Sequence, residues 1–195
     1  LYEDMGYKVL GYAEGGFRNV LSQKAIRTPE DMVGMKIRVP ESQAFLSTFT
    51  ALGANPTPIA FSEVFTACQQ GTIDGLELPI VSAYTGSYYE VCSYYDMTGH
   101  FYNAIGMVCS RSFWESLSPE LQEIFQQAAD EAKVEQREWL QTAADGMLDE
   151  MEAAGCTIVR DVDTAAFQEA AAPVYEEYRD IIGSDLLDRA LESLA

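Results

Sequence analysis

One short segment combines a strand pattern with two cationic side chains. In GMKIRVP, residues 34–40, three apolar residues alternate with Lys36 and Arg38. Strict alternation of this kind is typical of a half-buried strand. One explanation is a strand with one face in water. The other is that Arg38 points into a cleft, where its planar guanidinium would bind a carboxylate through two parallel hydrogen bonds.

The cysteines and the histidine form no metal-binding or redox motif. Cys68, Cys92, Cys109 and Cys156 lack zinc-site spacing, no CxxC is present, and His100 is the single histidine. We therefore expect no metal and no cofactor, and free buried thiols, with one disulfide still open in an oxidising compartment. Cys109 and His100 resemble a nucleophile and its base, but no third group is evident to orient them. We do not expect an enzyme.

Composition excludes several classes of protein. The chain has 195 residues, 48% of them hydrophobic, and 12 Lys and Arg against 31 Asp and Glu, for a net charge of −19. Nucleic-acid binding requires clustered cations, which this chain lacks. No apolar run reaches the roughly 18 residues of a membrane span. The sequence starts at Leu1 without a signal peptide, as expected for a mature or truncated product.

Helical and extended patterns alternate along the chain, which predicts an α/β fold. The expected extended segments are 7–12, 17–21, 35–39, 55–59, 76–78, 94–98, 104–110 and 156–159. The expected helices are 29–33, 42–52, 63–70, 80–89, 119–154, 164–172, 173–182 and 185–194. Gly15 and Gly16 are expected to form a flexible joint between the first two strands, and Pro173 to break a helix.

The longest predicted helix, 119–154, has two apolar clusters separated by the polar stretch 130–138. Its length of about 54 Å exceeds the diameter of a small domain. A helix with two buried ends and a solvated middle indicates a strut that joins two domains. The alternative is a helix that kinks near Gly146 and packs on one domain.

Several blocks resemble a single protein family. They are GFR at 16–18, TPEDMVGMKIRVP at 28–40, ALGANPTPIAFSEVFTACQQGTIDGLELP at 51–79, TGH at 98–100 and SPELQ at 118–122. In order, spacing and length they are similar to the solute-binding receptors of tripartite ATP-independent periplasmic (TRAP) transporters, of the DctP-like type. The resemblance covers essentially the whole chain.

This resemblance implies a two-domain periplasmic-binding-protein-like α/β fold with a long helix spanning both domains. The chain would be truncated at its N-terminus, with a partial first domain and a nearly complete second domain. Residues 1–15 would be a remnant of the first domain and 104–143 would return to it. Residues 16–103 and 144–195 would build the second domain.

The resemblance also implies roles for three side chains. Arg38 occupies the position of the arginine that pairs with the ligand carboxylate. Arg18 of GFR would be a second cation near the ligand, although an ion pair with an acid at the cleft edge remains open. Phe61 would pack on the ligand, unless it serves only to fix the start of the helix that follows.

Residues 77–79 differ from the pattern of many relatives, which have Glu-Asn-Pro where this chain has Glu77, Leu78 and Pro79. The asparagine hydrogen-bonds the ligand carboxylate or a nearby polar group, and leucine cannot. An apolar wall at Leu78 would favour a monocarboxylate with a hydrophobic body. Glu77 lies in the same block. Tyr84 would supply a hydroxyl or a stacking ring, unless it is a core residue.

The implied function is that of an extracytoplasmic receptor, which binds an organic acid and delivers it to a TRAP permease in the membrane. The location would be periplasmic or extracytoplasmic, and attachment as a lipoprotein remains open. The alternative is a ligand-sensing or scaffold module of the same fold without a transport role. A partial first domain would expose apolar surface, so we also expect self-association and weak ligand binding by this chain alone.

Overall fold

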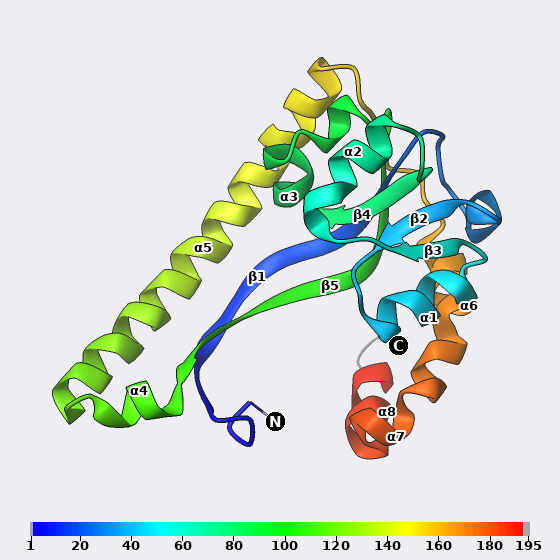
Figure 1. Cartoon of the computed structure of the whole chain (residues 1–195). Coiled ribbons are helices and arrows are strands. Elements are labelled where there is room, and N and C mark those ends of the chain that lie inside the picture. Colours follow the sequence, from blue (N-terminus) through cyan, green and yellow to red (C-terminus); the bar gives the residue numbers. More distant parts are fainter. Residues whose placement is uncertain (1, 193–195) are drawn as a thin grey trace.

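The computed structural model describes residues 2–192 as helices arranged around one mixed sheet (Figure 1). The six strands lie in the order β3-β2-β4-β1-β5-β6. Their bounds are β1 (Tyr7–Ser22), β2 (Lys36–Val39), β3 (Asn55–Pro58), β4 (Gly75–Pro79), β5 (Tyr94–Ser110) and β6 (Thr157–Val159). β2 is parallel to β3 and β4, β5 is parallel to β6, and β1 is antiparallel to both β4 and β5. The predicted α/β class is confirmed.

Helices cover both faces of this sheet. The α-helices are α1 (Gln43–Ala51), α2 (Val64–Gln69), α3 (Ile80–Thr85), α4 (Arg111–Ser116), α5 (Pro119–Ala153), α6 (Thr164–Glu177), α7 (Arg179–Ile182) and α8 (Ser184–Glu192). Short 3-10 helices are η1 (Pro29–Met32), η2 (Phe61–Glu63) and η3 (Tyr88–Glu90). Within residues 2–192, no helix has both the length and the apolar character needed to cross a membrane.

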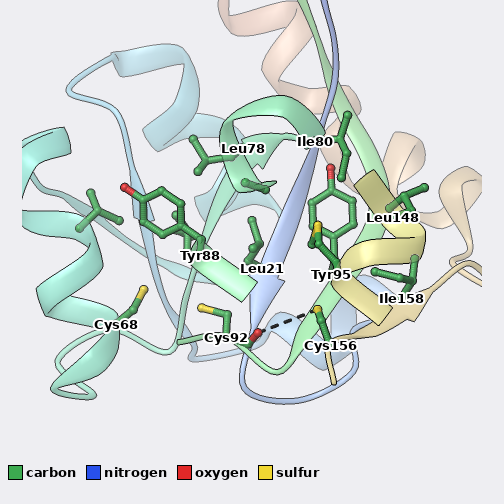
Figure 2. Close-up of a cluster of buried hydrophobic side chains, with 14 of the residues drawn as sticks. Leu21, Cys68, Leu78, Ile80, Tyr88, Cys92, Tyr95, Leu148, Cys156 and Ile158 are labelled. Atoms are coloured by element: carbon green, nitrogen blue, oxygen red, sulfur yellow. Dashed lines mark hydrogen bonds between the residues drawn. The ribbon is translucent and has the colours of Figure 1, made fainter. Parts of the chain in front are cut away.

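Each face of the sheet has its own hydrophobic core. The α5-side core contains Leu21, Leu76, Leu78, Tyr88 and Tyr95, packed against α2, α3 and the end of α5 (Figure 2). The α6-side core contains Val20, Ile37, Val39, Phe49 and Phe167, packed against α1 and α6. Neighbouring residues of a strand therefore enter different cores, as the pleat requires. Each fully buried large side chain contributes about 1.5–3 kcal/mol.

β1 and β5 are longer than predicted and extend from the sheet as a two-stranded ribbon (Figure 1). The joint expected at Gly15 and Gly16 is wrong, because the strand continues through it as an irregular step in the pairing, between Glu14 and Phe17. Gly16 has a φ of +75°, which only glycine adopts without strain. The two strands expected between residues 94 and 110 are likewise the single strand β5.

α5 confirms the long helix, with 35 residues and a length of about 52 Å. Ser118 caps it by accepting a hydrogen bond from the Leu121 backbone N–H at 3.3 Å. The helix is continuous through Gly146. It runs beside the β1–β5 ribbon (Figure 1).

The polar middle of α5 is only partly solvated, because several of its side chains bond to the backbone of β1. Gln136 donates to the Glu14 carbonyl at 2.7 Å and accepts from the Glu14 N–H at 2.8 Å. Arg137 donates to the Tyr12 carbonyl at 3.0 Å. These side chains satisfy backbone groups of the β1 edge that lies beyond β4. The expected solvated middle is therefore corrected to a polar contact.

Three helix boundaries differ from the sequence-based expectation. Pro173 lies inside α6 and does not end it. Because proline has no backbone N–H, α6 lacks one intrahelical hydrogen bond there, and tertiary packing keeps the segment helical. The helix expected over 80–89 ends at Thr85, because Ser87 has a φ of +53° and redirects the chain into η3. α4 was not predicted, although Ser110 caps it by accepting from the Phe113 N–H at 3.2 Å.

Candidate ligand-binding site

Arg38 lies near the C-terminal end of β2, between β3 and the central strand β4. Its neighbours Ile37 and Val39 enter the α6-side core, so its side chain points to the opposite face, toward α2 and Tyr88. The ends of parallel strands in an α/β sheet are where ligands characteristically bind. The alternating pattern of β2 therefore places Arg38 near the end of the parallel strands, where a ligand could bind.

The guanidinium of Arg38 has no acidic partner within residues 2–192. The side chain is only 4% exposed. Its Nε donates to the Ile59 carbonyl at 2.9 Å, and its guanidinium carbon lies 5.8 Å from the ring centre of Phe61. Burial lowers the pKa of Arg38, because the desolvated charge is compensated by no carboxylate in contact with it. A buried cation of this kind is complementary to an external anion.

Arg18 forms an ion pair with Glu77. Its Nε contacts Oε2 of Glu77 and its Nη2 donates to Oε1 at 2.7 Å, which is two-pronged geometry. Nη2 also donates to the Glu77 carbonyl at 3.1 Å. The guanidinium carbon lies 5.2 Å from the ring centre of Phe45. The alternative that the sequence left open, a pair with an acid, is the arrangement observed.

Glu77 is fully buried and also contacts His100. The Nε2 of His100 lies 3.4 Å from Oε2 of Glu77, and its Nδ1 lies 2.7 Å from the hydroxyl oxygen of Thr98. Burial lowers the pKa of His100 and outweighs the opposing effect of Glu77. His100 is thus a neutral hydrogen-bonding group on β5.

The two predicted arginines point to opposite faces of the sheet. Leu76 and Leu78 of β4 enter the α5-side core, so Glu77 and its partner Arg18 lie on the α6 side. Arg38 points to the α5 side. Within the described chain, only Arg18 of the two has a carboxylate in contact with it, although the charges of Glu77 and Arg18 still act on Arg38 from a distance.

Phe61 lies beside Arg38 and is 56% exposed. Its ring centre lies 6.1 Å from that of Tyr88, which is buried behind it. Phe61 is the first residue of η2, at the point where the chain leaves β3. An exposed aromatic ring next to a buried cation can pack on the apolar face of a bound molecule.

Leu78 and Tyr84 pack in the α5-side core and against α5. Leu78 is 3% exposed and belongs to the α5-side core, as Figure 2 shows. The hydroxyl of Tyr84 hydrogen-bonds to Glu150 on α5, and its ring stacks on Tyr89 at 6.1 Å. The hydrogen bond to Glu150 raises the pKa of Tyr84. Their contacts in this structure are those of packing between elements.

Sequence reasoning missed the partners of Arg18 and a cavity on the same face of the sheet. The signal for the first was present, because a glutamate inside the buried strand β4 requires a compensating group. The cavity has a volume of about 390 Å³ and is bordered by α1, β5 and α6, including His100, Phe167 and Tyr175. No sequence pattern indicated it, because its walls come from three distant segments.

No group of three or more His, Cys, Asp or Glu side chains within residues 2–192 could hold a metal ion. The charged side chains of the site are Arg18, which is partly buried, and Arg38 and Glu77, which are buried. Among the described residues, Arg38 has no carboxylate in contact with it. The arrangement is suited to binding a small anion.

Comparison with known proteins agrees with this geometry. The sequence model of the family "Bacterial extracellular solute-binding protein, family 7", DctP, matches residues 1–180. The chain belongs to this family. The predicted resemblance is thereby confirmed.

Individual DctP-family relatives match over most of the chain. The 2,3-diketo-L-gulonate-binding periplasmic protein YiaO of Escherichia coli (strain K12) is 34% identical over 185 residues, which are 94% of this chain and 56% of YiaO. It is named as a binding protein, in agreement with the expectation that this chain is not an enzyme. The chain thus spans a little over half the length of this relative.

Two solved structures of TRAP periplasmic solute-binding proteins have the same fold. One, from Sulfitobacter sp. NAS-14.1 with bound β-D-galacturonate, has a TM-score of 0.91 and 33% identity, and the match covers 96% of this chain and 63% of that one. The other, from Roseobacter denitrificans OCh 114 with bound L-galactonate, has a TM-score of 0.82 and 38% identity, over 92% and 61% of the two chains. The two-domain fold expected for the DctP family is the fold of these proteins.

Proposed function

We propose that the chain is the larger part of an extracytoplasmic receptor that binds an organic acid and delivers it to a TRAP permease. The observation that carries this proposal is Arg38, a buried guanidinium with no acidic partner in the described chain. A carboxylate would occupy that position through charge-assisted hydrogen bonds. Phe61 would pack on the body of the ligand.

Arg18 would act mainly through the shape of the site. Its guanidinium is already neutralised by Glu77, so it offers a ligand less net charge than Arg38 does. Glu77 would hold Arg18 in place and would not contact the ligand itself. Tyr84 would support the contact between α3 and α5 through Glu150.

The proposed ligand class is a sugar-derived monocarboxylate. The relatives described above are named for 2,3-diketo-L-gulonate, β-D-galacturonate and L-galactonate, which each carry one carboxylate and several oxygens. Leu78 lies in the core, so its apolar side chain gives little support to a ligand with a hydrophobic body. This favours a polar acid over the branched or aromatic acids expected from the sequence.

The proposed domain division follows the ribbon and the long helix. Residues 1–15 and 104–143 would belong to a first domain, and 16–103 and 144–195 to a second. The irregular pairing between Glu14 and Phe17 supports a boundary there, because it lies where the ribbon leaves the sheet. The ligand would bind between the domains, and closure would be favoured only when an anion offsets the charge of Arg38.

A thermal-shift screen of the full-length protein tests this function. The panel would contain galacturonate, galactonate and 2,3-diketogulonate, with galactose as a neutral control of matched size. We expect at least one acid to raise the unfolding temperature and galactose to leave it unchanged. Stabilisation by galactose equal to that by its acid would contradict a carboxylate-binding site.

A further inference from the structure

Three of the four cysteines are buried together in the α5-side core. Cys68 is 4% exposed, Cys92 1% and Cys156 5%, whereas Cys109 is half-buried on β5. All four are free thiols in this structure. Their grouping was not evident from the sequence, in which 24 residues separate the first two.

Cys68 and Cys92 face each other across this core. Figure 2 shows their sulfur atoms pointing toward one another, Cys68 from α2 and Cys92 from the segment that precedes β5. Each thiol acts on the other, lowering the pKa of Cys68 and raising that of Cys92. Cys156 is arranged differently, because its thiol donates to the backbone carbonyl of Cys92 at 4.0 Å and not to a thiol.

We propose that Cys68 and Cys92 are a disulfide-forming pair, whose bond ties α2 to the segment that precedes β5. The relevance of the bond in the cell rests on the extracytoplasmic location proposed above, because disulfides persist in oxidising compartments. The chemistry of the pair can be tested in solution without reference to that location.

The reaction is an exchange with an external disulfide. The Cys92 thiol lowers the pKa of Cys68, so Cys68 supplies the attacking thiolate. It forms a mixed disulfide with one half of the oxidant and releases the other half as a thiol. The Cys92 sulfur then attacks Cys68 and displaces the second half. In total, two thiols lose two protons and two electrons, one S–S bond forms, and the oxidant disulfide becomes two thiols.

This bond would stabilise the back of the candidate site. The N–H of Cys92 donates to the Tyr88 carbonyl at 2.9 Å, and the Tyr88 ring packs against Phe61 and Phe65. Phe61 lies beside Arg38. A cross-link between Cys68 and Cys92 would therefore connect both ends of the aromatic cluster that supports the arginine.

The test is disulfide mapping of the full-length protein after refolding in a buffer of oxidised and reduced glutathione. Free thiols are alkylated under denaturing conditions, and unreduced peptides are identified by mass spectrometry. We expect a linked peptide joining Cys68 to Cys92 in most molecules, and the same link in Cys109→Ser and Cys156→Ser. We expect Cys68→Ser to leave Cys92 alkylated.

A second test measures the unfolding temperature with and without a reductant, so that the conclusion does not depend on the folding of any one variant. Reduction should lower the unfolding temperature by about 5–10 °C in the wild type and in Cys109→Ser, and should have no effect in Cys68→Ser. Complete alkylation of Cys68 and Cys92 after oxidation, or a link from Cys92 to Cys156, would overturn the proposal. Neither measurement uses a ligand, so a failure of the disulfide proposal can be distinguished from a failure of the protein to bind organic acids.

Discussion

Arg18 and Glu77 form a two-pronged ion pair across the β1–β4 contact, with Nη2 of Arg18 2.7 Å from Oε1 of Glu77. Glu77 is fully buried and His100 contacts the same carboxylate. Two residues that the sequence placed around a ligand are therefore partners of each other. This pairing leaves Arg38, on the opposite face, as the cation best suited to an external carboxylate.

Breaking this pair should be costly. Glu77→Gln removes the negative charge and leaves Arg18 buried beside a neutral amide, so we expect a loss of about 3–5 kcal/mol in the free energy of unfolding. Glu152→Gln is the matched control, because Glu152 pairs with Arg160 on the surface, where solvent screens the pair, so this variant should lose much less. Urea unfolding measures both. Equal losses in the two variants would contradict a special role for the buried pair.

The stability of the protein should depend on pH through Asp96. Burial raises the pKa of Asp96 to about 6, and its carboxylate lies 2.7 Å from the Ser22 hydroxyl. The same hydroxyl oxygen lies 2.5 Å from the Lys24 carbonyl, so when its one proton is donated there, a protonated Asp96 can donate to Ser22. Since the folded pKa exceeds the unfolded value, the contribution of Asp96 is fully present below about pH 4 and is lost as pH rises through 6.

Asp96→Asn removes this titration and keeps both a donor and an acceptor. Between pH 4 and 7 we expect the wild type to lose on the order of 2–3 kcal/mol relative to the variant. Denaturant unfolding at several pH values measures the difference in the free energy of unfolding between the wild type and the variant. The other titrating groups are the same in both proteins, so their contributions cancel in this difference. A difference that stays constant with pH, or one of opposite sign, would show that Asp96 is not desolvated as described.

Two glycine substitutions should have opposite effects. A Cβ at Gly15 would lie 2.8 Å from the Asn103 carbonyl, so Gly15→Ala should lose about 1–3 kcal/mol. A Cβ at Gly146, inside α5, would meet no described atom within 4 Å, so Gly146→Ala should gain about 0.5–1 kcal/mol. Thermal unfolding of both variants is the measurement. Stabilisation by Gly15→Ala would argue that the ribbon is a loose joint after all.

The 195-residue chain alone should self-associate. Its ribbon and the neighbouring helices carry exposed apolar side chains, which include Tyr7, Tyr12, Ile105, Phe113, Leu121, Ile124 and Phe125. Patches of this kind mark contact surfaces. Light scattering coupled to size-exclusion chromatography should show species larger than 21.6 kDa at micromolar concentration. A strictly monomeric chain would contradict the idea that this surface needs a partner.

Much of the fold follows from local patterns. Alternation around Arg38 predicted a strand, and the helix starts expected at residues 29 and 119 are those of η1 and α5. The length of α5 was also predicted, because no proline interrupts it before Gly155. These features depend on neighbours in the sequence.

The errors come from contacts between distant segments. Gly15 lies in a continuous strand because β5 pairs on both sides of it, and Pro173 remains helical because α6 packs on α1. Tyr84 turns toward Glu150, which is 66 residues away. Leu78 and Glu77 could not be assigned to opposite faces until the two cores were known. No local pattern contains that information.

The central claim is that Arg38 binds the carboxylate of the ligand, and calorimetry on one variant tests it most directly. With the acid that gives the largest thermal shift, Arg38→Gln in the full-length protein should weaken binding by about 30-fold or more. Arg27→Gln, which alters an exposed ion pair with Asp161, should bind as the wild type does. Circular dichroism would confirm that both variants are folded. An affinity of Arg38→Gln equal to that of the wild type would contradict the account.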